Sequence, residues 1–142
     1  MGPLLEQVLD NNMETVKVVF KHFPLNMHKQ AKPASYAAIA AEKQGKFWEY
    51  HDELFLNIKK LNDPNTLMEI AKKIGLDIAQ FSKDMMSPQT KNKVEQDIRD
   101  GAQAGVTGTP AIFINGRILK KRSAADAQKI IDDELKKLNS GK

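Results

Sequence analysis

Residues 105–117 read GVTGTPAIFINGR, and this stretch restricts the fold more than any other part of the chain. Asn115-Gly116 between two apolar runs is the strongest short-range signal for a β-hairpin. The expected strands are the runs PAIFI and RILK on either side of it. Pro110 opens the first run, and because a proline lacks the N–H that a ladder needs, it must stand at a strand's first residue or at an edge.

The other segments predict helices and one further strand. Residues 15–23, TVKVVFKHF, are rich in β-branched and aromatic side chains, and we interpret residues 16–21 as a parallel-sheet strand buried on both faces. Apolar spacing and capping residues predict helices over 3–10, 33–44, 46–61, 64–75, 77–86, 87–104 and 123–138, with Asp77, Ser87 and Ser123 as caps. This order is typical of one α/β domain with a helical insertion.

The charge of the chain raises the question of nucleic acid, because the net charge is +4. The 22 Lys and Arg are interspersed with 18 Asp and Glu, and the one basic cluster, Lys120-Lys121-Arg122, is interpreted as a solvated strand end. We therefore expect no nucleic-acid partner. No apolar run reaches the length of a membrane span, and the N-terminal residues MGPLLEQVLD lack the pattern of a signal peptide.

Few residues of the chain offer chemistry. The chain has no cysteine, which excludes disulfides, cysteine–zinc sites and thiol nucleophiles within it. His22, His28 and His51 include no pair at the i, i+4 spacing of a helical metal site, and His51 lies on an apolar helix stripe, typical of a half-buried histidine. We expect no bound metal or cofactor.

Two further patterns are interpreted as structural. Glu49, Asp52 and Glu53 crowd one helical turn, typical of a solvated face, whereas acid–base catalysis needs carboxylates that converge in a cleft. The glycines between 101 and 108 form no phosphate-binding fingerprint, because a strand follows them where a nucleotide fold places a helix.

Three segments resemble the DsbA-like branch of the thioredoxin superfamily, which are thiol-disulfide oxidoreductases. They are VVFKHFPL…H…A…A…A (18–40), QGKFWEYHDELF (44–55) and GVTGTPAIFINGR (105–117), and the last two together are specific. The resemblance covers nearly the whole chain. It implies a single thioredoxin-like domain over 1–142, an α/β fold with an inserted helical subdomain at about 33–104.

The resemblance also implies the substrate-binding residues Gly108, Thr109 and Pro110. In the family this proline follows a cis bond, and the backbone at the position of Thr109 pairs with an extended substrate polypeptide, a form of strand addition. The implied partners are cysteine-containing polypeptides, and the implied location of the parent protein is periplasmic or otherwise extracytoplasmic.

The chain departs from the family at the C-x-x-C motif. In the family a proline follows the two cysteines in the same helix, and Pro3 matches it, so the resemblance implies that both cysteines and the first strand would precede Met1. Two hypotheses remain. The chain belongs to a disulfide oxidoreductase of DsbA type and is inactive by itself, because exchange needs a thiolate; alternatively, it is a non-catalytic peptide-binding module.

The missing strand has a consequence for assembly. In thioredoxin-like folds it lies between the strands that match 16–21 and 111–114 here, so its loss leaves two edges with unpaired backbone groups. Either these two strands pair directly, or a second copy covers the edges. We favour a homodimer, because packed helices resist a shift of one strand spacing, about 4.8 Å.

Overall fold

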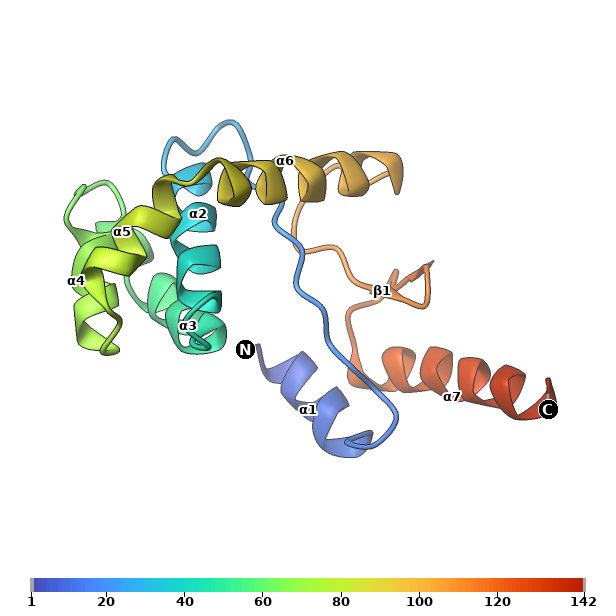
Figure 1. The fold of residues 1–142 in the computed structure, drawn as a ribbon. Helices are drawn as coiled ribbons and strands as arrows, with labels where there is room; N and C mark the ends of the chain where they lie inside the picture. The colour runs from blue at the N-terminus through green and yellow to red at the C-terminus, as the bar shows by residue number, and fades with distance from the viewer. Residues whose placement is uncertain (1, 142) are drawn as a thin grey trace. The chain divides into compact units, whose positions relative to one another are not determined.

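A computed structural model describes residues 2–141 of the chain (Figure 1). The chain divides into two compact units, which we call the terminal unit (residues 1–20 and 108–142) and the helical unit (residues 21–107). Among the described residues, none of the helices combines the length and the apolar character that crossing a membrane requires.

The helical unit is built around one alanine-rich helix. This helix, α2, contacts α3, α4, α5 and α6. The elements of the unit are α2 (Ala31–Glu42), α3 (Phe47–Leu56), the short 3-10 helix η1 (Ile58–Lys60), α4 (Thr66–Lys73), α5 (Ile78–Met86) and α6 (Pro88–Gln103).

The expected helices of this unit are present, and their bounds differ from the expected ones by at most two residues except at one end. The helix expected over 46–61 ends at Leu56, and a separate 3-10 turn follows. Asn57 explains this end, because its side-chain Nδ2 donates to the backbone oxygen of Glu53 at 2.9 Å. Such a side-chain bond competes with the continuing helix.

The three caps expected from the sequence are confirmed. Asp77, Ser87 and Ser123 precede α5, α6 and α7 (Ala124–Ser140), and each accepts a hydrogen bond from the backbone N–H three residues later. This bond satisfies one of the N–H groups that a helix start leaves without a partner.

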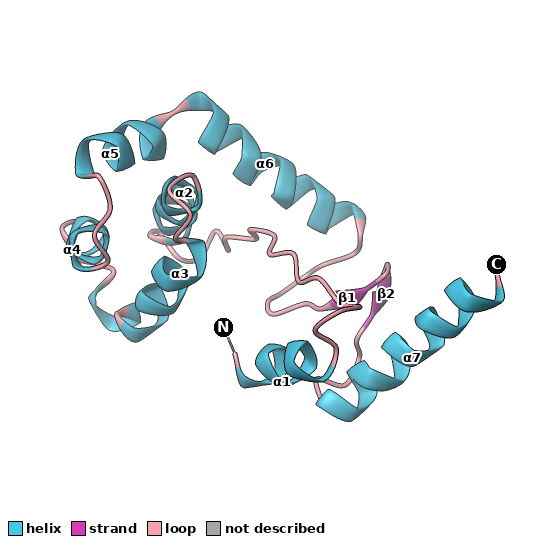
Figure 2. Cartoon of the chain, turned by 60° about the horizontal axis from the view of Figure 1, so that its bottom comes forward, coloured by secondary structure: helices cyan, strands magenta, loops and turns pink. Residues whose placement is uncertain are grey.

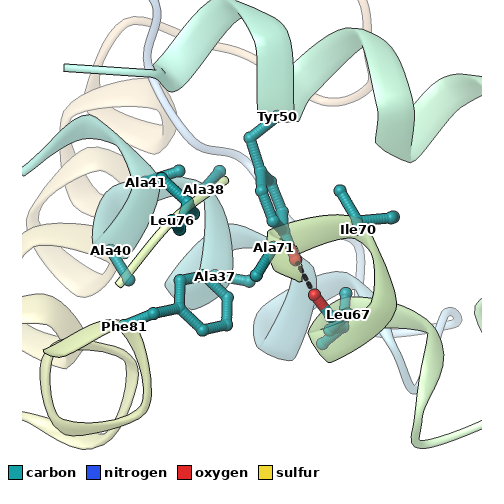
Figure 3. Packing of buried hydrophobic residues seen from close by; sticks show 10 residues of the cluster. All are labelled: Ala37, Ala38, Ala40, Ala41, Tyr50, Leu67, Ile70, Ala71, Leu76 and Phe81. Carbon is teal, nitrogen blue, oxygen red and sulfur yellow. Dashed lines mark hydrogen bonds between the residues drawn. The ribbon is translucent and has the colours of Figure 1, made fainter. Parts of the chain in front are cut away.

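The core of the helical unit lies where α2 meets α3, α4 and α5 (Figure 3). Small side chains on α2 let Tyr50 and Phe81 pack close to it, with 5.6 Å between the two ring centroids. The Tyr50 hydroxyl donates to the backbone oxygen of Leu67 at 2.8 Å, and burial raises the pKa of Tyr50 above its usual value. The one polar atom of this ring is therefore paired.

The terminal unit combines two helices with a hairpin (Figure 2). Its elements are α1 (Pro3–Asn11), β1 (Phe113–Ile114), β2 (Arg117–Ile118) and α7. A small apolar core joins them, formed by Val8, Leu119, Ala127 and Ile131. Partly buried side chains pack against this core, among them Val16, Ile112 and Ile114.

The predicted hairpin is confirmed. Phe113 lies opposite Ile118 in the antiparallel pair, and the turn residues Asn115 and Gly116 have φ angles of 47° and 80°. Two positive φ angles are the signature of the tight hairpin turn that an Asn-Gly pair favours. The strands are shorter than PAIFI and RILK, since each has two residues.

The prediction of a strand at residues 16–21 is wrong. Residues 16–25 form no helix or strand, and within residues 2–141 the sheet consists of β1 and β2 alone. Val19 is 65% exposed, so the segment is not buried on both faces either. β-branched residues favour extended backbone, but a strand also needs a hydrogen-bonded neighbour, which the described residues do not supply.

Candidate functional site

The loop that carries the candidate residues follows α6. Gly105, with a φ angle of 81°, ends the helical path, a conformation that glycine adopts at little cost. Val106 then donates its N–H to the backbone oxygen of Gly101 at 2.9 Å. This bond ties the start of the loop to the last turn of the helix.

Gly108, Thr109 and Pro110 lie together in this loop, and all three are exposed. The peptide bond between Thr109 and Pro110 is cis, the geometry that the family resemblance implies. A side chain at Gly108 would meet no atom within 4 Å, so the space around this residue is open.

The backbone of the loop has unused hydrogen-bonding capacity. Among the described residues, no hydrogen bond involves the backbone of residues 108–111. Every non-proline residue carries one N–H donor and one C=O acceptor, which here are left to water or to a binding partner. Unpaired backbone groups of this kind also occur along the edge of a sheet.

The hairpin fixes the end of the loop. Ile112 packs against the core of the terminal unit, and its oxygen accepts from the N–H of Leu119 at 2.8 Å. The exposed residues thus lie directly before an anchored, hydrogen-bonded position.

The other chemical candidates of the sequence do not form a site. Within residues 2–141, no three His, Cys, Asp or Glu side chains lie close enough to hold a metal ion. Glu53 pairs with Lys73 at 2.8 Å, and Asp52 lies 3.0 Å from Nδ1 of His51. Glu49, on the same helix, is exposed. The expectation of a solvated carboxylate face holds for Glu49 and Asp52, but not for Glu53, whose side chain is only 15% exposed.

The three histidines lie in different surroundings. His51 is partly buried, as expected, with its side chain 16% exposed and its ring centroid 4.8 Å from that of Phe55. His28 is exposed, and His22 is 5% exposed. Burial lowers the pKa of His22 to about 4, so this ring is neutral at pH 7.

Sequence reasoning missed a buried carboxylate beside His22. The side chain of Asp97, on α6, is completely buried and accepts from the backbone N–H of His22 at 2.9 Å and from Nζ of Lys93 at 2.6 Å. The i, i+4 spacing of Lys93 and Asp97 is the only signal in the sequence, and such pairs are also common on exposed helix faces.

A surface hollow in the terminal unit does not include the loop. Its volume is about 540 Å³, and β2 and α7 form its walls. Four cationic residues and two carboxylates line it together with apolar side chains: Arg117, Ile118, Leu119, Lys120, Lys121, Asp126, Lys129, Ile130 and Asp133. Residues 108–111 are not among them, so the hollow and the loop are separate features.

Comparison with known proteins points to one family and one fold. The family described as DSBA-like thioredoxin domain matches residues 4–136. A crystal structure titled as a thioredoxin-like oxidoreductase from Silicibacter pomeroyi DSS-3 superposes with a TM-score of 0.77, at 22% identity, covering 93% of this chain and 75% of that one. This similarity shows that the chain has a thioredoxin-like fold.

Two kinds of curated relatives match. "Probable disulfide bond formation protein D" of Bacillus anthracis is 30% identical over 141 residues, which cover 94% of this chain and 64% of the relative. "Na(+)/H(+) antiporter NhaA 3" of Salinispora tropica is 36% identical over 104 residues, covering 72% of this chain and 16% of the relative. The chain therefore matches about a sixth of the antiporter's length and less than two thirds of the Bacillus protein's.

Proposed function

Because the chain belongs to the family of DSBA-like thioredoxin domains, we propose that the protein carrying it performs thiol–disulfide exchange on polypeptides. In this proposal residues 108–110 hold an extended segment of the substrate beside the reacting sulfur atoms. The relative in Bacillus anthracis, whose name refers to disulfide bond formation, supports this reaction class.

The observation that carries the proposal is the exposed loop at Gly108, Thr109 and Pro110. Its backbone makes no hydrogen bond among the described residues, and the hairpin anchors the position that follows it. Strand addition suits a protein that must accept many polypeptides, since main-chain hydrogen bonds are the same for every sequence. The loop offers this kind of recognition.

The exchange itself needs sulfur. A thiolate attacks one sulfur of a disulfide, a new S–S bond forms, and the other sulfur leaves as a thiolate. No residue among these 142 can supply the attacking group, because the chain has no cysteine. We therefore propose that the chain contributes fold and substrate binding, and that the thiols come from outside these residues.

The second candidate function is binding without redox chemistry. It is favoured by the same combination of an intact loop and the absence of cysteine. In that case the chain is a peptide-binding module on a thioredoxin-like fold. The two functions differ in whether the complete protein contains a C-x-x-C pair, which the sequence of its full gene decides.

We also propose that the protein acts outside the cytoplasm. Disulfides form and persist in oxidising compartments, whereas cytosolic thiols are kept reduced. The name of the Bacillus relative refers to disulfide bond formation, the chemistry that such a compartment permits. Locating the full-length protein with an antibody in fractionated cells tests it, and recovery only with cytoplasmic markers would refute it.

The chain by itself is expected to show no thiol–disulfide exchange, because it contains no sulfur nucleophile. The measurement is the turbidity of insulin as dithiothreitol reduces it. The rate with the 142-residue chain should equal the rate of the blank. A clear acceleration over the blank contradicts this prediction.

Polypeptide binding is expected at the exposed loop. With the alkylated insulin B chain as probe, the amide NMR signals of residues 108–112 should shift, and those of α4 should not. Gly108→Leu should weaken this binding about tenfold or more, because the new side chain fills the open space at the loop. Gly2→Leu is the matched control, since Gly2 is equally open. Equal affinity of both variants and the unaltered chain would contradict the assignment.

A further inference from the structure

The chain crosses between its two units twice, and the first crossing segment lies on α6. This crossing falls between Phe20 and Lys21. Directly after it, the N–H of His22 donates to Oδ2 of Asp97 at 2.9 Å, and Nζ of Lys21 donates to Oδ2 of Asp100 at 3.0 Å. The entering segment is thus held by two carboxylates on one turn of α6.

Phe23, which follows His22, packs on the same turn of α6. A Cβ atom placed on Gly101 would lie 2.7 Å and 2.8 Å from two ring carbons of Phe23. Real Cβ atoms do not approach other atoms so closely, so only glycine lets the ring lie against the helix. This contact explains a glycine within α6, where it disfavours the helix by about 1 kcal/mol relative to alanine.

The second crossing leaves from the same turn. It falls between Thr107 and Gly108, and the last residue tied to the helical unit before it is Val106, whose N–H donates to the oxygen of Gly101 at 2.9 Å. Residues 97–101 therefore hold the segment that enters the helical unit and the segment that leaves it. The candidate loop begins two residues beyond Val106.

Within this turn, Asp97 makes the strongest interactions with the first crossing segment. Its buried carboxylate accepts from the N–H of His22 and from Nζ of Lys93, and Nζ of Lys21 lies 3.9 Å away. Hydrogen bonds to a charged acceptor are stronger than neutral ones, and a buried N–H that loses its acceptor has no substitute from water. Removal of this carboxylate should loosen the first crossing segment.

We propose that the Asp97–Gly101 turn is a clamp on which both crossing segments depend, so that Lys21–Phe23 and Val106 open together. Gly101 connects them, since one of its faces carries the Phe23 ring and its backbone oxygen holds Val106. The clamp is made within the helical unit and does not depend on the proposed function.

Native-state hydrogen exchange followed by NMR tests the clamp. Asp97→Ala removes the acceptor of His22 but leaves both partners of the Val106–Gly101 bond in place. We expect the amides of His22 and Val106 to exchange faster, both by about tenfold or more, while amides in the α4 and α5 core keep their rates. Glu95→Gln is the control, because Glu95 is an α6 carboxylate paired with Lys32 at 2.9 Å.

The amide of Val106 decides the outcome. If the amide of His22 exchanges faster but that of Val106 keeps its rate, the two crossing segments open independently and the proposal is wrong. Unchanged exchange rates at both amides also overturn it. If Asp97→Ala does not fold, Phe23→Leu loosens the ring on Gly101 instead. That variant should accelerate the exchange of Val106, and an unchanged rate there equally overturns the clamp.

Discussion

Replacing Phe81 by alanine is expected to lower the free energy of unfolding of the helical unit by about 3–5 kcal/mol. Phe81 has no exposed surface and packs in the core that α2, α3, α4 and α5 form. The substitution removes a whole ring and leaves a cavity beside Tyr50, whose ring lies 5.6 Å away. Urea unfolding followed by circular dichroism measures the change.

Phe55 provides the matched control for this substitution. It has the same side chain and also lies on a helix of the helical unit, but it is 62% exposed. Phe55→Ala should change stability by no more than about 0.5 kcal/mol, as is usual for exposed positions. If the two variants lose similar stability, the core is not where the structure places it.

Acid is expected to destabilise the helical unit through His22. Burial lowers the pKa of its ring to about 4 in the folded chain, whereas an unfolded histidine titrates near 6.5. Below pH 6.5 His22 binds a proton in the unfolded chain but not in the folded chain. The free energy of unfolding therefore falls as the pH drops from 6.5 towards 4. The full difference corresponds to a loss of about 3 kcal/mol.

The charges around His22 have opposing effects. Burial of the ring is the largest cause and lowers its pKa, Asp97 raises it, and Lys93 and His51 lower it further. Protonation therefore places an additional charge in a buried place where a buried carboxylate is already paired with Lys93. The folded state then loses free energy relative to the unfolded one.

Urea unfolding at pH 7 and pH 4.5 measures the effect of acid. His22→Gln keeps a neutral side chain at both pH values, so most of the loss seen in the unaltered chain should disappear. His28→Gln is the control, because His28 is exposed and its variant should keep the full loss. An equal loss in the His22 variant and in the unaltered chain would contradict the prediction.

Carboxylates with a lowered pKa affect the stability of the fold mainly at lower pH. Hydrogen bonds from Gln80, Gln96 and Lys137 are the leading causes that lower the pKa values of Asp84, Asp100 and Glu134, in that order. Groups with a lowered pKa stabilise the fold above their unfolded values, and this contribution is lost as the pH falls through the folded pKa. The window from pH 6.5 to 4 therefore reports chiefly on His22.

The features that the sequence determined by itself depend on few neighbouring residues. Asn115-Gly116 specifies a tight turn because both residues tolerate positive φ angles, and the structure contains that turn. Asp77, Ser87 and Ser123 begin helices because a short polar side chain reaches an N–H three residues away. The candidate loop was also found from the sequence, through its resemblance to a family motif.

Other features could only be decided by the tertiary structure. Residues 16–21 have the composition of a strand, but pairing depends on a neighbour that no local pattern specifies, and the described residues supply none. Asp97 and Lys93 look like an exposed helical pair, yet the segment at His22 covers Asp97 and makes it a buried acceptor. A turn or a cap is complete within a few residues, whereas a strand's partner and a carboxylate's burial depend on residues far away in the sequence.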